Sequence, residues 1–379
     1  MNNFSFWEMI GSFLYILGGL GIFLYGMKGM SSAIQKLAGD GMRSIMANVT
    51  RNRCFALLTG LSVTCLVQSS SATTVMVVSF VNAQLLTLTE SIGVIMGANL
   101  GTTLTGWIIA SVGKFSLSKI ALPLIGIGFP FIFLKREKLN HFGEFLIGFG
   151  LLFFGLSELK NAVPDVKSLL QSADPADQLL VENVKSVIEQ LNSYGFFSIL
   201  IFVVIGVILT IMVQSSSAAM GITIILSANG WINFEIAAAI VLGENIGTTI
   251  TAWLASIGTS ITAKRAARAH FIFNITGVLW MLILFYPFTS LVNELMPGAI
   301  YTSEISDIDA KDYLTKKGLT SESFTDEEIV AAKKSIVDSN IPLHLSMFHT
   351  LFNLCNICLL IWFSPNIARL AERLVREKT

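Results

Sequence analysis

Seven apolar runs, each about long enough to cross a bilayer, set the strongest limit on what this chain can fold into. A spanning helix needs about 20 residues. Only 13% of the residues are charged, against roughly 25% in soluble domains. We therefore predict an all-α polytopic protein embedded in the lipid bilayer. No nucleic-acid partner is expected, because the net charge is zero. The runs lie at 6–27, 91–112, 118–134, 141–159, 234–258, 270–292 and 342–363.

Two further apolar stretches, 54–86 and 196–232, are each interrupted near the middle by the same polar cluster. The cluster Gln-Ser-Ser-Ser-Ala occupies Gln68–Ala72 and recurs at Gln214–Ala218. Each stretch is typical of two short helices that meet at a polar break. Broken backbone is tolerated at membrane depth only where it lines a cavity or is buried in protein. We predict a helical hairpin at each break.

The two clusters belong to a long internal repeat, which is a signal to seek before any other. Gly97–Thr103 recurs as Gly243–Thr249 at an offset of 146 residues, the same offset that relates the two Gln-Ser-Ser-Ser clusters. Upstream, the glycines up to Gly26 match those up to Gly155 at an offset of 129 residues. Collinear matches of this length indicate two homologous halves.

Positive charges predict how these halves lie in the membrane. If both interrupted stretches are re-entrant hairpins, four basic segments fall on one side, which is cytoplasmic by the positive-inside rule. These segments are 28–53, 135–138, 264–268 and the tail 369–378. The long loops 160–195 and 293–340, and the N-terminus, then lie outside. The hairpins open from opposite sides, so the two halves are inverted.

The predicted organisation has four parts. The first inverted repeat covers 1–140 with its hairpin at 54–86, and the second covers 141–292 with its hairpin at 196–232. An acidic extracytoplasmic loop at 293–340 precedes a C-terminal transmembrane helix and basic tail at 341–379. Inverted repeats with broken helices are the signature of secondary transporters, whose sites lie near the midplane between the repeats.

The serine clusters are candidate anion ligands. A helix that begins at the serines offers free N–H groups and the positive end of its dipole, and the hydroxyls add donors. The spans around both clusters contain no basic residue, so dipoles, hydroxyls and co-bound cations would have to hold the anion. The candidates are Gln68, Ser69, Ser70, Ser71, Gln214, Ser215, Ser216 and Ser217.

The repeated Asn-x-x-Thr-Thr motifs are candidate cation ligands. Their carbonyl and hydroxyl oxygens suit a hard monovalent cation, as do the carbonyls released at the two glutamines. Polar side chains also join transmembrane helices, but duplication of the whole constellation favours a site. The candidates are Gln68, Asn99, Thr102, Thr103, Gln214, Asn245, Thr248 and Thr249.

Three ionisable residues remain open to several interpretations. Glu244 stands where the first half has Ala98. An intramembrane carboxylate is a functional hypothesis by default; Glu244 could shape a cation site, carry a proton or be paired for structural reasons. His270 and His349 each precede an asparagine by four residues. Hydrogen bonding between helices is the favoured role for both, ahead of proton relay.

These motifs resemble the type II sodium–phosphate cotransporter family. The paired Gln-Ser-Ser-Ser clusters, the paired Gly-x-Asn-x-Gly-Thr-Thr motifs and Ala269–Gly277 match its pattern across most of residues 10–290. The resemblance implies a carrier that couples inward sodium flow to phosphate uptake by alternating access. It implies phosphate ligands in the serine clusters and sodium ligands in the Asn-x-Gly-Thr-Thr motifs. A bacterial-type member would lie in the inner (plasma) membrane as a multi-pass protein.

One departure from the family affects stoichiometry. Electrogenic animal members carry an aspartate in the span after the first asparagine motif, but Ile120–Pro130 contains no acidic residue. Two alternative functions stay open: a sodium-coupled carrier of another small anion, such as sulfate or a carboxylate, and a non-transporting phosphate sensor. No catalytic constellation or ATPase signature occurs, so we expect no enzyme activity and no cofactor besides sodium as coupling ion. The sequence does not fix the oligomeric state.

Overall fold

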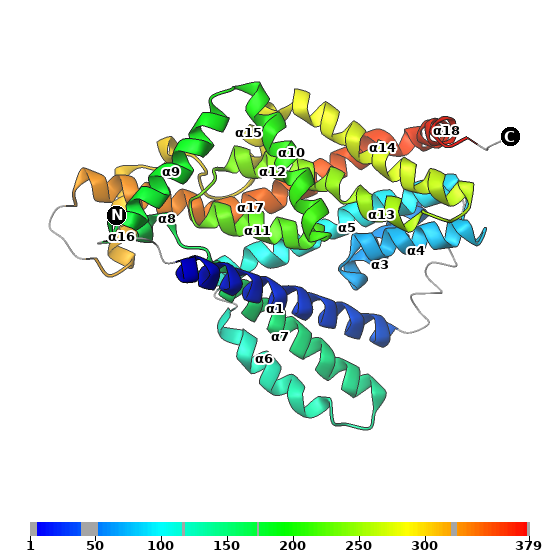
Figure 1. Cartoon of the computed structure of the whole chain (residues 1–379), viewed down its shortest axis with the longest axis horizontal. Helices are drawn as coiled ribbons and strands as arrows, with labels where there is room; N and C mark the ends of the chain where they lie inside the picture. The colour runs from blue at the N-terminus through cyan, green and yellow to red at the C-terminus, as the bar shows by residue number, and fades with distance from the viewer. Residues whose placement is uncertain (1–5, 39–51, 116–117, 173, 320–323, 377–379) are drawn as a thin grey trace.

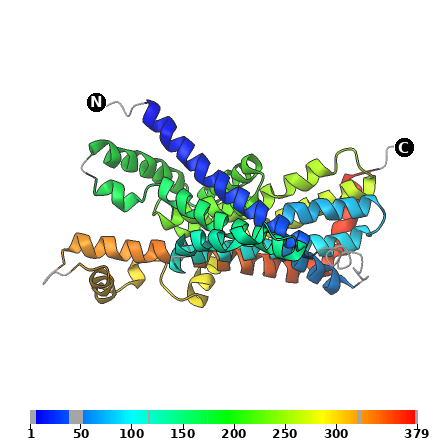
Figure 2. The same ribbon diagram turned by 90° about the horizontal axis from the view of Figure 1, so that it is seen from below.

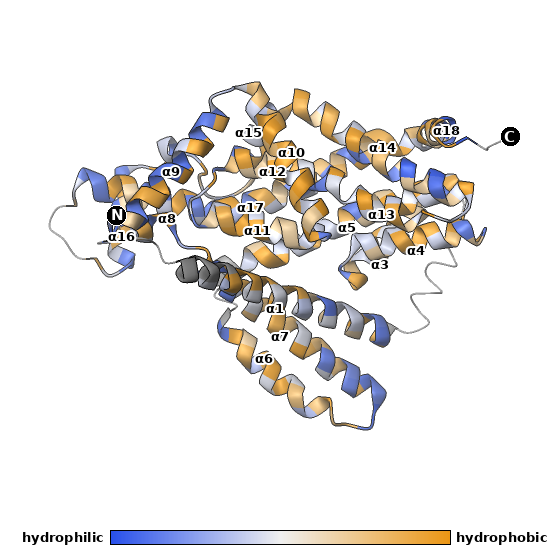
Figure 3. Ribbon diagram, viewed as in Figure 1, coloured by the Kyte–Doolittle hydropathy of each residue, from blue (hydrophilic) through white to orange (hydrophobic). Residues whose placement is uncertain are grey.

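The structure is a computed structural model that describes residues 6–38, 52–115, 118–172, 174–319 and 324–376. The described part of the chain is helical and has no strand, which confirms the predicted all-α class. Six helices in it are long and apolar enough to cross a membrane. Apolar residues dominate the middle of the molecule and polar residues gather toward its two ends (Figure 3). The chain is therefore a multi-pass membrane protein.

The first half contains a long helix, a broken pair and two further helices. The predicted interruption near Gln68 falls between the members of the broken pair. The basic stretch predicted at 28–53 lies outside the described residues at 39–51. The helices are α1 (Phe6–Ala38), α3 (Arg53–Val67), α4 (Ser70–Asn82), α5 (Leu88–Phe115) and α6 (Ser118–Phe131).

The second half repeats this order with additional short helices. Its broken pair is α10 and α11, which meet near Gln214. At 18 residues, α10 is itself long enough to span a membrane. The helices are α7 (Glu137–Ala162), α8 (Val166–Leu170), α9 (Pro175–Asn192), α10 (Phe196–Val213), α11 (Ser216–Ala228), α12 (Phe234–Gly247), α13 (Thr249–Ala255), α14 (Ile261–Ile283) and α15 (Phe285–Leu295).

The stretch predicted as an acidic loop, 293–340, is largely helical. It contains the 3-10 turn Thr302–Glu304, α16 (Asp307–Lys316) and the first half of α17 (Asp326–Leu360). Ala310 and Leu314 pack on Ile329 and Ala332 to join α16 to α17. Lys333 Nζ lies 2.7 Å from Asp307 Oδ1, and its hydrogen bond and charge lower the pKa of that carboxyl below its ordinary value. The chain ends in a 3-10 turn, Ile361–Phe363, and α18 (Ser364–Leu374).

Glycines bring the broken pairs against the long helices in the same way in both halves. A Cβ on Gly97 of α5 would lie 2.0 Å from the carbonyl oxygen of Leu57 in α3, and one on Gly243 of α12 would lie 1.9 Å from that of Val203 in α10. Small residues permit this close approach of helix backbones in membranes. The contacting pairs are related by the sequence offset of 146 residues.

The register of these contacts gives the chain direction in each broken pair. Gly93 lies near the backbone of Arg53, and Gly101 lies near Leu61, so α3 and α5 run parallel. A five-residue connection, 83–87, joins α4 to the start of α5. The chain therefore advances along α3, reverses at Gln68 and returns along α4 to the end where α3 began.

Helices α1 and α7 pack through a reciprocal set of contacts. A Cβ on Gly26 would lie 2.3 Å from the backbone nitrogen of Leu152, and one on Gly155 would lie 2.2 Å from that of Phe23. Gly26 corresponds to Gly155 and Phe23 to Leu152 at the offset of 129 residues, so the two contacts are equivalent. The same offset relates the Gly19–Leu159 contact to the contact between Gly148 and Met30. The two helices are thus antiparallel and related by a local two-fold axis.

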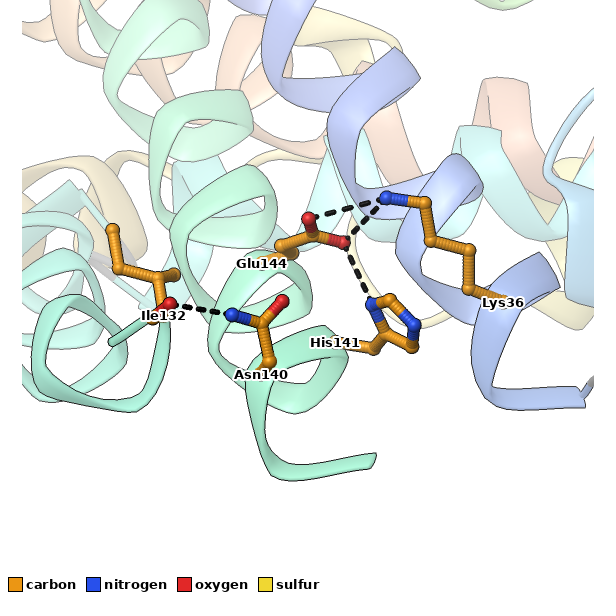
Figure 4. A network of polar contacts seen from close by, with 5 residues as sticks. All are labelled: Lys36, Ile132, Asn140, His141 and Glu144. Carbon is orange, nitrogen blue, oxygen red and sulfur yellow. Dashed lines mark hydrogen bonds and ion pairs between the residues drawn. The ribbon is translucent and has the colours of Figure 1, made fainter. Parts of the chain in front are cut away.

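Helix α6 completes a group with α1 and α7 that projects from the rest of the molecule (Figure 1). Figure 2 shows α1 running obliquely across the other helices. Near the end of α1, Lys36 Nζ contacts Glu144 Oε2 at 2.9 Å, and His141 Nδ1 lies 3.2 Å from the same oxygen (Figure 4). Asn140 of α7 also donates a hydrogen bond to the carbonyl oxygen of Ile132.

The described basic segments gather at one end of the molecule. The end of α1, the α6–α7 turn and α18 lie there, whereas α8, α9 and α16 lie at the opposite end (Figure 1). This separation follows the charge pattern along the chain, because the first group carries the basic clusters and the second the long polar segments.

Candidate functional site

The two polar breaks have nearly identical backbone geometry. Gln68 ends α3 with φ 53° and ψ 28°, and Gln214 ends α10 with φ 54° and ψ 24°. A left-handed conformation is costly for a residue with a Cβ and is often found at functional sites. Both glutamines thus turn the chain so that a new helix starts two residues later.

Serine caps the helix that follows each break. Ser69 Oγ accepts a hydrogen bond from the Ala72 N–H at 3.1 Å, and Ser215 Oγ accepts one from the Ala218 N–H at 3.2 Å. Each hydroxyl keeps its own hydrogen for donation outward. The N–H groups of the first turn and the positive dipole end face the same way, so each break presents a compact set of donors to an anion.

Both breaks open onto one cavity of about 500 Å³. This large cavity brings together all eight residues of the two Gln-Ser-Ser-Ser clusters, although 146 residues separate the clusters in sequence. The two glutamines differ in exposure. Gln68 is buried and its Oε1 accepts a hydrogen bond from Thr105 at 3.1 Å, whereas Gln214 is exposed.

A polar face of α1 forms another wall of the large cavity, and this wall was not predicted from sequence. Lys28, Ser31, Ser32 and Gln35 line it, at spacings that put them on one helix face. Ser31 donates a hydrogen bond to the carbonyl oxygen of Val67, and Gln35 donates to Ser31 Oγ at 3.0 Å. The spans around the clusters themselves contain no basic residue, but Lys28 of α1 adds a lysine to the cavity that the clusters line. The polar residues at positions i, i+3, i+4 and i+7 of this helix were the signal in the sequence that could have predicted the wall.

A second, much smaller cavity of about 10 Å³ adjoins the first. This volume is comparable to the space that one water occupies. Ser70 and Ser216 line both cavities. The remaining residues of the small cavity come from both repeats and from α17: Asn99, Thr102, Glu244, Asn245, Thr248 and His349.

The structure separates the predicted cation ligands into two sets. Asn99, Asn245, Thr102 and Thr248 line the small cavity, and the hydroxyls of the two threonines also bond backbone carbonyls of their own helices. The lining drawn from the described residues includes neither Thr103 nor Thr249, whose hydroxyls donate to backbone carbonyls at 2.8 and 2.7 Å. Gln68 and Gln214 line the large cavity instead.

The two motif asparagines join the repeats to α14 and α17. Asn99 donates to Asn274 Oδ1 at 2.8 Å, and His270 Nε2 lies 3.2 Å from Asn99 Oδ1. In the second repeat, Asn353 donates to Asn245 Oδ1 at 3.4 Å. The predicted hydrogen bond between helices is thus present for His270. The side chain of His349 makes none among the described residues, and Asn353 makes the contact of α17 with the second repeat instead. Helix α17 takes the place beside the second repeat that α14 takes beside the first.

Glu244 is the carboxylate of the small cavity. It is 3% exposed, and Thr223 Oγ1 donates a hydrogen bond to its Oε1 at 2.7 Å. His349 lines the same cavity, and its buried Nδ1 has no hydrogen-bond partner among the described residues. This half of the site therefore carries a group that can be anionic, which the Ala98 half lacks.

The sequence matches the model of a known protein family. The family model described as Na+/Pi-cotransporter matches residues 22–161 and 169–295. The match covers both repeats and ends before α17. No solved structure matches the chain.

Three relatives illustrate the range of similar proteins. YqeW of Bacillus subtilis is 32% identical over 73% of this chain and 83% of its own length. The candidate inorganic phosphate export protein YjbB of Salmonella typhimurium is 29% identical over 74% of this chain and 48% of its own length, so the chain spans about half of that relative. Sodium-dependent phosphate transport protein 2B of Homo sapiens is 31% identical over 49% of this chain and 28% of its own.

Proposed function

Because the chain belongs to the Na+/Pi-cotransporter family, we propose that it imports inorganic phosphate by sodium-coupled symport. The observation that carries this proposal is the meeting of two serine-capped helix ends at one cavity. Helix N-termini are ready-made phosphate sites, and paired half-helices in secondary transporters direct such ends at anionic substrate groups. The proposed phosphate ligands are the eight residues of the two Gln-Ser-Ser-Ser clusters.

The small cavity is the proposed sodium site. Asn99, Thr102, Asn245 and Thr248 offer neutral oxygens there. Glu244 adds a carboxylate that would favour a cation and could couple its binding to transport. Thr103 and Thr249 are weaker candidates, because the lining of this cavity among the described residues includes neither of them.

Shared residues give the two sites a physical route for coupling. Ser70 and Ser216 line both cavities, so an ion in the small cavity lies next to donors that face the large one. A cation there would offset the charge of the bound anion and orient the two hydroxyls. Each ligand would then raise the affinity for the other, as linkage requires.

Alternating access between inverted repeats is the proposed mechanism of movement. The reciprocal antiparallel contacts of α1 and α7 support an inverted relation between 1–140 and 141–292. The reversal of the chain at Gln68 supports a re-entrant hairpin over 54–86, and the matching contacts of α10 and α12 support one over 196–232. We propose that the end carrying α18 faces the cytoplasm of a bacterial inner membrane.

Export is the second candidate, because relatives such as YjbB are named for phosphate export. A symporter moves phosphate in the direction of the combined gradients, so an inward sodium gradient favours uptake. We expect no enzyme activity and no cofactor; the proposed partners are phosphate, sodium and the bilayer.

Radiolabelled phosphate uptake into proteoliposomes tests the proposal. An inward sodium gradient should drive uptake above equilibrium, and replacing sodium with choline should abolish it. Excess sulfate or a carboxylate should compete weakly. Phosphate flux that ignores sodium would contradict symport, stronger transport of another anion would support a different carrier, and binding without flux would support a sensor.

A further inference from the structure

We propose that Lys28 of α1 binds the phosphate directly and supplies the positive charge that the two helix ends lack. This inference rests on the proposed function. Lys28 lines the large cavity together with both serine clusters, although it belongs to neither. It lies on the same face of α1 as Ser31, Ser32 and Gln35, which together form a polar wall of the cavity.

A count of the charges that the protein itself supplies shows what this residue would add. Each helix N-terminus acts as roughly half a positive charge, so two ends provide about one. Before any sodium binds, a divalent phosphate therefore remains about one charge short of neutral. Lys28 can supply this charge within the cavity, and its ammonium brings three donors to the oxyanion.

The surroundings of Lys28 leave it available for a ligand. Within the described part of the chain it has neither an ion pair nor a hydrogen bond. Lys36 is two turns further along the same helix and is held by Glu144 at 2.9 Å. The two lysines thus provide a natural comparison. Lys28 lines the cavity with no partner among the described residues, and Lys36 is paired with Glu144 near the end of the helix.

Phosphate binding to purified full-length protein in sodium buffer provides the test. Lys28→Gln should raise the phosphate Kd at least tenfold, because a hydrogen-bonded charge partner is lost. Lys28→Arg should retain affinity within about threefold. The matched control Lys36→Gln removes a charge from the same helix and should leave the Kd within twofold. Sodium affinity in the absence of phosphate should be unchanged in all three variants.

Chemical rescue separates loss of charge from misfolding. Lys28→Cys should bind phosphate weakly and recover after modification with an aminoethyl methanethiosulfonate, which restores an ammonium. The sulfonatoethyl reagent should weaken binding further. Wild-type protein treated with both reagents controls for Cys54 and Cys358, which are exposed.

The outcomes distinguish this inference from the proposed function. If wild-type protein neither binds nor transports phosphate, the proposed function fails. If wild-type protein transports phosphate but Lys28→Gln matches Lys36→Gln, the assignment of Lys28 alone is overturned. A lipid headgroup has the same phosphate chemistry, so binding is repeated with added phosphatidylglycerol. Competition by this lipid that disappears in Lys28→Gln, with inorganic phosphate affinity unchanged, would likewise overturn the assignment.

Discussion

Ser70 and Ser216, separated by 146 residues in the chain, each line both the large and the small cavity. They hold the same position in the two repeats, at the first turn of α4 and of α11. No other residue pair among the described residues is common to both linings. A substitution at these serines should therefore change the binding of both phosphate and sodium.

We predict two effects of the double variant Ser70→Ala with Ser216→Ala. The phosphate Kd at saturating sodium should change little. The change in phosphate Kd between low and saturating sodium should become much smaller than in the wild type. Ser71→Ala with Ser217→Ala is the matched control, because that pair lines the large cavity alone. The control should weaken phosphate binding and keep the sodium effect. The measurement is the phosphate Kd over a series of sodium concentrations, and equal behaviour of the two double variants would remove the coupling role.

The two threonines of each motif should behave differently. Removing the hydroxyl in Thr102→Val or Thr248→Val should raise the sodium concentration for half-maximal uptake about tenfold or more, because losing a partner of a charged group costs roughly 1.5–3 kcal/mol. Thr103→Val and Thr249→Val are controls of equal chemistry that lie outside the small cavity. If sodium dependence shifts equally in the control variants, the small cavity is not the sodium site.

Phosphate transport is predicted to move no net charge. The span Ile120–Pro130 lacks an acidic residue, which favours two sodium ions per divalent phosphate and no net charge moved. A membrane potential acts on each uncompensated charge with ~2.3 kcal/mol per 100 mV. Uptake should therefore be insensitive to a potassium–valinomycin potential.

A phosphate flux that rises with an inside-negative potential would contradict this expectation. Glu244→Gln then becomes informative, since Glu244 is the carboxylate that lines the small cavity. Loss of the potential dependence in Glu244→Gln would assign the additional charge to this residue.

Glycine contacts predict where the fold tolerates no enlargement. Gly97→Ala and Gly243→Ala should each abolish or strongly reduce the folded protein recovered from membranes, because the added Cβ would meet a carbonyl oxygen at 2.0 or 1.9 Å. Overpacking usually costs about 1–3 kcal/mol where side chains can adjust, and here the neighbour is backbone. Gly126→Ala, with no described atom within 4 Å of its Cβ, should be recovered at the wild-type level by size-exclusion chromatography.

The sequence was most informative where a pattern was repeated. Duplication located both helix breaks and predicted that Gln68 and Gln214 belong to one site. In the structure both residues line the same cavity. Repetition could not decide between neighbours such as Thr102 and Thr103, since adjacent residues differ by about 100° around a helix. Which of them faces the cavity depends on how α5 is rotated against α3 and α14.

Residues outside the duplicated motifs were harder to anticipate. Lys28 lines the same cavity as the clusters because α1 packs beside α3, and the sequence between these helices does not predict that packing. His349 lies on α17, beyond the repeated region, and joins the site because Asn353 contacts Asn245. Such long-range placement depends on tertiary packing, which periodicity does not encode.

The reciprocal contacts between α1 and α7 have the form of an isologous interface, in which one surface meets a copy of itself. Gly26 against Leu152 and Gly155 against Phe23 are the contacts that two identical chains would make around a two-fold axis. Two identical chains would carry the same residue at corresponding positions of such an interface. Joined in one chain, the two halves can differ, and one half carries Ala98 where the other carries Glu244.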